Sequence, residues 1–186
     1  MKKLFFFLSI FLLFTSCLKS EKKPKASNNA EITKKIEQLY SSYGKSSDVL
    51  YDKPFDGNLF SPTLKQKLEE ALNASKADIE KVKKSAHPDE KPMVIEGSLF
   101  TSLYEGYTSY KIQNIMEQNH PKESMATVKV QLENSSVSPK EVWTDTIHLI
   151  NNSNNGWRID NINFDTKANS KDLKTDLDQF ISATKQ

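Results

Sequence analysis

The sequence predicts an α+β domain, in which helices precede an antiparallel sheet and one further helix follows it. Two observations support this class. Apolar residues recur at every third or fourth position before residue 85 and after residue 170, whereas four runs between residues 107 and 164 alternate apolar and polar residues. Helical and strand patterns that are segregated along the chain are typical of α+β folds. We expect the amino-terminal helices to pack against a curved sheet of about four strands.

Three helices are expected ahead of the sheet. The first spans Glu31 to Gly44, because its apolar residues would line one face of a helix. A second should begin at Ser61-Pro62, since serine is a favoured N-cap and proline fits the first helical turn. A third, short helix is expected from Ser75, which with Asp78 approximates a capping box. It should end before the proline-containing segment that starts at residue 87.

The four expected strands occupy residues 107–117, 125–133, 142–151 and 157–164. The second has the clearest pattern, with apolar residues at alternate positions from Ala126 to Leu132. One apolar and one polar face imply a sheet that is covered on one side only. Turn-forming residues connect the strands, so neighbouring strands should form antiparallel hairpins. A last helix is expected from Ser170 to about Ala183.

Residues 1–16 have the features of an export signal. Two lysines precede an apolar core of 11 residues, Leu4 to Phe14. This core is shorter than the roughly 20 residues that a membrane-spanning helix needs. Residues 14–17, Phe-Thr-Ser-Cys, resemble the bacterial lipobox, although Phe14 replaces the usual leucine. The resemblance implies cleavage before Cys17 and lipidation of that cysteine, palmitate included; the alternative is an ordinary secretory signal with an incidental cysteine.

Residues 17–30 are interpreted as a tether and residues 31–186 as a single domain. The leader holds two of the 26 basic residues, which leaves 24 basic and 24 acidic residues in the mature chain. The tether takes four basic residues and one acidic residue, so the domain keeps 20 basic and 23 acidic residues, a formal charge of −3. A mildly acidic domain does not suit nucleic acid, which requires a clustered basic face.

The predicted location is the bacterial cell envelope, with the membrane reached through lipidated Cys17. Buried acyl chains contribute about 0.8 kcal/mol per methylene, which makes a multiply acylated cysteine a stable anchor. Leu18 is not the aspartate that often favours the inner membrane. In a cell with two membranes we therefore expect attachment to the outer membrane, facing the periplasm or the cell surface.

Five stretches of the domain are similar to a family of small bacterial envelope proteins known as domain of unknown function 3828. They are Tyr40-Ser41-Ser42-Tyr43, Glu96 to Thr101, Tyr104-Glu105-Gly106, Gly156 to Ile162, and Leu173 to Phe180. Over residues 30–184 the resemblance implies the cone-shaped fold named after nuclear transport factor 2. The family has no established catalytic residues, so none is carried over. Cone folds often dimerise through the sheet, which by analogy allows a homodimer.

Motifs for cofactor and metal chemistry are absent from the sequence. Its three histidines, His87, His120 and His148, show no metal-site spacing, and no second cysteine accompanies Cys17. The chain also lacks a phosphate-binding loop and a nucleophile elbow. We therefore predict no cofactor, no metal and no enzymatic activity.

The candidate pocket or recognition surface consists of Phe100, Tyr104, Trp143 and Asp145. The loop from Glu96 to Gly106 places apolar residues between two Glu-Gly pairs, and it could rim a pocket, present aromatic side chains or plug the open end of the sheet. Asp145 is in phase with Trp143 on the apolar face of its strand. It could therefore act as a base in a cone pocket, line that pocket, or pair with a cation at the sheet edge.

Three functions follow as hypotheses. The first is a lipid-anchored, non-enzymatic binding module for a small ligand or another envelope component. The alternative is a periplasmic immunity or inhibitor lipoprotein that neutralises a toxin. A weaker alternative is a cone-fold isomerase that uses Asp145. A deep pocket at Asp145 would favour ligand binding or catalysis, whereas a filled interior with exposed aromatic residues would favour a protein partner.

Overall fold

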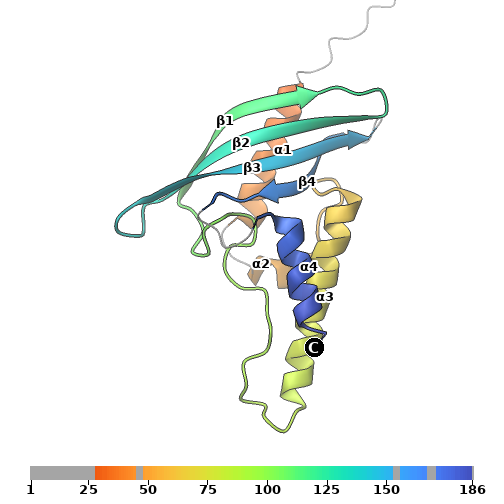
Figure 1. The fold of residues 1–186 in the computed structure, drawn as a ribbon, viewed down its shortest axis with the longest axis vertical. Helices are drawn as coiled ribbons and strands as arrows, with labels where there is room; N and C mark the ends of the chain where they lie inside the picture. Colours follow the sequence, from red (N-terminus) through yellow and green to blue (C-terminus); the bar gives the residue numbers. More distant parts are fainter. Residues whose placement is uncertain (1–27, 45–47, 153–155, 167–170, 186) are drawn as a thin grey trace, which may run out of the picture.

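The structure is a computed structural model that describes residues 28–44, 48–152, 156–166 and 171–185. The expected leader, Cys17 and all but the last residues of the expected tether lie outside these residues. In chain order the elements are α1 (Asn28–Tyr43), α2 (Asp48–Asp52), α3 (Pro62–Lys83), β1 (Ser109–Gln118), β2 (Glu123–Asn134), β3 (Glu141–Asn152), β4 (Arg158–Asn163) and α4 (Leu173–Ala183). The predicted α+β class is confirmed (Figure 1).

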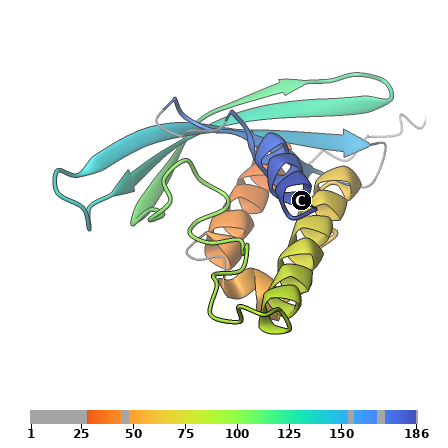
Figure 2. The same cartoon turned by 60° about the horizontal axis from the view of Figure 1, so that its bottom comes forward.

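The four strands form one antiparallel sheet in the order β1-β2-β3-β4. The helices lie on one side of this sheet, which gives the molecule two layers (Figure 2). The strand face toward the helices is mainly apolar, and its buried apolar residues on β2 and β3 are Ala126, Val128, Val130, Leu132, Trp143, Ile147 and Leu149. Cross-strand partners share a face, so the alternation seen in the sequence produces a sheet that is covered on one side.

Helix α3 is one continuous helix, so the predicted break at Ser75 is wrong. The Ser75 side chain is buried and forms a 2.6 Å hydrogen bond with the hydroxyl of Tyr51. Its hydroxyl thus bonds to another segment and does not cap a new helix. The start of α3 agrees with the prediction, because Ser61 is its N-cap and accepts the Leu64 N–H at 3.1 Å.

Helix α4 begins at Leu173, three residues after the predicted start. Its N-cap is Asp172, whose carboxylate accepts the Thr175 N–H at 3.1 Å. An ion pair between Lys67 and Asp178 joins α4 to α3. Lys174 joins the first turn of α4 to β4 through a 2.7 Å ion pair with Asp160. These contacts fix α4 beside α3 and below the sheet (Figure 1).

The segment before α3 extends the sheet at β4. Ile159 N–H donates to Leu59 at 2.8 Å, and Ser61 N–H donates to the Ile159 carbonyl at 2.8 Å. Phe60 and Ile159 thereby form a parallel bridge. At the opposite edge of the sheet, the register between β1 and β2 shifts after Ile112, which indicates a β-bulge.

A cluster of buried rings fills the interior between the helices and the sheet. Phe60 stacks on Phe100 with ring centroids 5.6 Å apart, and the Tyr43 ring meets both edge-on at 5.3 and 5.8 Å. These three rings come from α1, from the segment before α3 and from the loop before β1. Aromatic pairs in these geometries add stability beyond the area that they bury.

Candidate functional site

The carboxylate of Asp145 is fully buried and surrounded by donors from the protein. It accepts the Thr101 hydroxyl at 3.0 Å, the Ser102 N–H at 3.1 Å and the Asp165 N–H at 3.2 Å. The Trp143 indole N–H donates to it at 3.3 Å, and the Ser102 hydroxyl is a further donor. Asp145 therefore ties the loop before β1 and the segment after β4 to strand β3.

Burial raises the pKa of Asp145, and the hydrogen bonds from Ser102, Thr101 and the Asp165 N–H lower it to a smaller extent. The prediction that this residue faces the apolar side of β3 is confirmed. A general base must lie within hydrogen-bond reach of a substrate proton. Asp145 is 0% exposed, and its carboxylate accepts hydrogen bonds from groups of Thr101, Ser102, Trp143 and Asp165. This arrangement suits a structural link between three segments.

The four residues of the predicted surface do not lie together on the outside of the molecule. Phe100 is 0% exposed and Trp143 is 3% exposed, whereas Tyr104 is 60% exposed. Trp143 lies beside Asp145, while Phe100 belongs to the ring cluster. The loop from Glu96 to Gly106 thus has two roles, because Phe100 plugs the interior and Tyr104 reaches the surface.

Tyr104 lies over Gly97, which explains the glycine at that position. Gly97 has a φ of +71°, and a Cβ atom there would come within 2.5 Å of the Tyr104 ring. The Ser98 N–H also donates to the Tyr104 carbonyl at 2.9 Å. Only glycine combines this backbone conformation with so close an approach, and the loop therefore folds back on itself.

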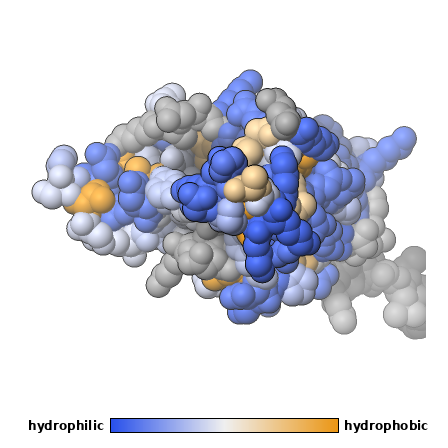
Figure 3. Space-filling model, turned by 90° about the horizontal axis from the view of Figure 1, so that it is seen from below, coloured by the Kyte–Doolittle hydropathy of each residue, from blue (hydrophilic) through white to orange (hydrophobic). Residues whose placement is uncertain are grey.

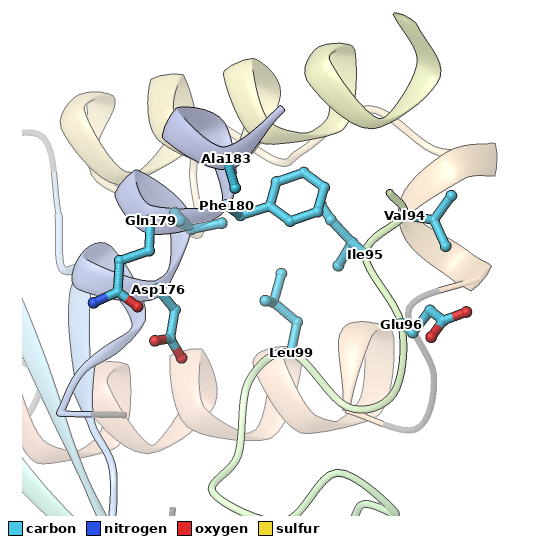
Figure 4. A pocket seen from close by; sticks show the side chains of 9 residues that line it. Val94, Ile95, Glu96, Leu99, Asp176, Gln179, Phe180 and Ala183 are labelled. Atoms are coloured by element: carbon cyan, nitrogen blue, oxygen red, sulfur yellow. The ribbon is translucent and has the colours of Figure 1, made fainter. Parts of the chain in front are cut away.

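A cleft of about 400 Å³ lies between the segment 94–99 and helix α4 (Figure 4). Its lining residues are Val94, Ile95, Glu96, Leu99, Asp176, Leu177, Gln179, Phe180 and Ala183. Leu99 and Phe180 project from opposite walls into the space between them (Figure 4). The α4 wall was missed from the sequence. A half-buried Phe180 shows that the inward face of α4 is only partly covered.

Hydrogen bonds hold the wall formed by residues 94–99 in place. The Ile95 N–H donates to the Tyr51 hydroxyl at 3.0 Å, and the Met93 N–H donates to Asp78 at 2.7 Å. The Ser98 hydroxyl donates to the Gly44 carbonyl at 3.1 Å. This segment has no regular secondary structure. Its position is set by α1, α2 and α3.

Each wall of the cleft contributes one carboxylate. Glu96 is exposed and pairs with Lys91 at 3.0 Å, and this interaction raises the pKa of Lys91. Asp176 lies in the first turn of α4, where a negative charge is favourable. The cleft thus combines an apolar floor with acidic groups at its sides. Such a site suits noncovalent binding.

A second depression, of about 330 Å³, lies on the uncovered face of the sheet. Thr127, His148 and Asn161 are cross-strand neighbours on three strands and contribute to its lining. Burial lowers the pKa of His148, while Asp160 and Asp172 act in the opposite direction. This depression is more polar than the cleft at α4.

The three histidines of the chain lie in separate segments of the structure. His87 and His120 are exposed in separate loops, and His148 lies on β3. Within the described ranges, no three histidine, cysteine, aspartate or glutamate side chains gather in a group that could hold a metal ion.

The underside of the molecule bears mainly hydrophilic residues, with apolar residues in small groups (Figure 3). None of the helices in the described ranges is both long and apolar enough to cross a membrane.

Comparisons with protein-family models, curated proteins and solved structures find no match to this chain. The cleft at α4 is an apolar depression whose walls are held by hydrogen bonds and ion pairs.

Proposed function

We propose that this chain is a lipid-anchored protein of the bacterial envelope, whose domain binds another envelope protein without catalysing a reaction. The cleft between residues 94–99 and α4 is the observation that carries this proposal. Its floor is apolar and its sides are acidic, a composition that provides contact area and orientation for a bound segment. Lipidation of Cys17 would keep the domain at the membrane where the partner resides.

The filled interior favours a protein partner over a small substrate. Rings such as Phe60 and Phe100 occupy the interior between the helices and the sheet. The carboxylate of Asp145 is engaged by donors of the protein, which gives the isomerase hypothesis little support. The remaining apolar cleft is open at the surface, where the side chain of a partner can enter.

We also propose that the fold is a cone of the nuclear transport factor 2 type, as the resemblance to domain of unknown function 3828 implies. A four-stranded antiparallel sheet with helices on one face supports this proposal. Attachment to the outer membrane and a homodimer remain predictions.

Site-specific photo-cross-linking in intact cells tests the binding function. A photoreactive amino acid at Gln179, in the cleft, should cross-link the full-length chain to an envelope protein. The same amino acid at Asn73, exposed on α3, should not. Ala183→Phe, which fills the cleft, should remove the cross-link, whereas Ser182→Phe on the exposed side of α4 should preserve it. Equal cross-linking in the two phenylalanine variants would contradict the proposal.

A second candidate, the immunity or inhibitor lipoprotein, is favoured by the exposure of Tyr104. Its ring is 60% exposed and lies against Gly97, in a loop that is hydrogen-bonded to Asp145 through Ser102. Rigid, exposed tyrosines are common at protein interfaces. If a toxin gene lies beside this gene, cells exposed to that toxin should lose protection with Tyr104→Ser under this hypothesis, and should retain it if the cleft alone binds the partner.

A further inference from the structure

We infer that the partner enters the cleft with a large aliphatic or aromatic side chain that is flanked by lysine or arginine. This inference rests on the proposed binding function and names the chemistry that the same site would recognise. The occupant is a peptide segment of a protein, with a basic residue beside the apolar residue that it inserts.

The floor of the cleft fits an apolar side chain. Leu99 and Phe180 are half-buried and project into the cleft from its two walls (Figure 4), and the lining also includes the buried residues Ile95 and Leu177. A leucine or phenylalanine inserted between them would remove apolar surface from water on both sides. Complete burial of such a side chain contributes about 1.5–3 kcal/mol.

The charge of the lining indicates a cationic neighbour for that side chain. The nine lining residues, all of them described, include Glu96 and Asp176 but no lysine, arginine or histidine. Lys91 contacts Glu96 from outside the cleft, and both side chains are exposed. Exposed ion pairs of this kind contribute about 1 kcal/mol or less, so a cation on the partner can replace or share the Lys91 contact.

Both walls are fixed before a partner binds, which favours a short segment as the occupant. Hydrogen bonds from the N–H groups of Met93 and Ile95 hold one wall, and the ion pairs of Lys174 and Asp178 hold the other. A preformed cleft requires little ordering of the protein on binding. Most of the conformational entropy lost on binding would then be lost by the partner segment.

Labelled peptides and the full-length protein in detergent micelles test this inference by fluorescence anisotropy. Three nonapeptides share one glycine-serine frame and differ at the centre, which is Lys-Leu-Lys, Glu-Leu-Glu or Lys-Ala-Lys. The Lys-Leu-Lys peptide should bind at least about tenfold more tightly than either of the others, because only it supplies both the apolar side chain and the cations. Raising the salt concentration should reduce its advantage over Glu-Leu-Glu.

Matched variants distinguish the effect of the Glu96 charge on peptide binding from the effect of filling the cleft. Glu96→Lys should weaken binding of the Lys-Leu-Lys peptide by about fivefold. Glu105→Lys is the control, because it changes the net charge by the same amount. Like Glu96, Glu105 precedes a glycine, but it lies outside the cleft. Ala183→Phe should abolish binding, and Ser182→Phe should preserve it.

Three results would overturn the inference. They are equal binding of the Lys-Leu-Lys and Glu-Leu-Glu peptides, equal effects of the two lysine variants, and no binding of any peptide. Binding of hexylamine in the absence of peptide binding would also overturn it, since the occupant would then be a small amphiphile. If the peptides fail but Ala183→Phe still removes the cellular cross-link, the proposed binding function stands and only the chemistry of the partner is wrong.

Discussion

The hydroxyl of Ser61 donates a 2.6 Å hydrogen bond to Asp160, which lies 99 residues later in the sequence. The same hydroxyl oxygen accepts the Leu64 N–H at the start of α3. The other carboxylate oxygen of Asp160 accepts from Lys174 on α4 at 2.7 Å. The side chains of Ser61, Asp160 and Lys174 thus join α3, β4 and α4, and these contacts help to set the position of the α4 wall of the cleft.

Ser61→Ala should reduce the free energy of unfolding by about 1–2 kcal/mol, because it removes both a helix cap and a buried hydrogen bond. Urea denaturation followed by circular dichroism measures this loss. Thr63→Ala is the control, since Thr63 is exposed in the same helical turn. Equal stability losses in the two variants would show that the bond between Ser61 and Asp160 contributes little.

Asp145→Asn should destabilise the domain by about 1–3 kcal/mol, although the two side chains have nearly the same shape. The new amide NH2 would face donors that cannot accept, among them the Ser102 N–H and the Trp143 indole N–H. Tryptophan fluorescence during urea denaturation reports the change. Asp89→Asn, in an exposed loop, is the control. An unchanged midpoint for Asp145→Asn would mean that the network around Asp145 rearranges at no cost.

His148 should make the stability of the domain depend on pH. Its pKa in the folded chain is below the ordinary value of 6.5, so the unfolded chain binds the proton more readily. Neutral His148 makes its full contribution to the free energy of unfolding above pH 6.5. That contribution is lost as the pH falls through the lower pKa of the folded state. The wild-type chain should therefore lose more stability than His148→Gln between about pH 7.5 and about pH 5.

Denaturation midpoints of the wild type and His148→Gln at several pH values measure that difference. Groups that titrate alike in both chains cancel in the comparison. His120→Gln, in the exposed turn between β1 and β2, controls for the loss of one imidazole. Parallel pH profiles for the wild type and His148→Gln would contradict the prediction.

Cys17→Ser should move the protein from the membrane fraction to the soluble fraction of the cell, because the attachment site for the acyl chains is lost. Fractionation and immunoblotting measure the distribution. Ser20→Ala, three residues later in the expected tether, should leave the protein in the membrane fraction. Unchanged membrane recovery of Cys17→Ser would rule out the lipid anchor.

Local patterns predicted most of the secondary structure. Alternation identified the four strands and the inward orientation of Asp145, and the Ser61-Pro62 pair identified the start of α3. The same local reasoning failed at Ser75. A serine followed by an acidic residue is typical of a helix start, but the partner of Ser75 is Tyr51, 24 residues earlier. A contact of this range leaves no periodic signal in the sequence.

The candidate site was less predictable than the fold. The loop from Glu96 to Gly106 was identified from its composition, and Leu99 does line the cleft. The other wall belongs to α4, and only the folded chain brings these two segments together. Which apolar residue of the loop is buried also depends on tertiary contacts, since Phe100 meets rings from two other segments.

The two outer strands of the sheet present different surfaces to neighbouring molecules. Along β4, the N–H and carbonyl groups of Ile159 are hydrogen-bonded to Leu59 and Ser61, so another strand cannot pair with them. Along β1, the bulge after Ile112 interrupts the regular spacing of N–H and carbonyl groups. Covered or bent edges discourage strand addition between proteins. Copies of this domain at high local concentration would thus resist joining edge to edge into aggregates.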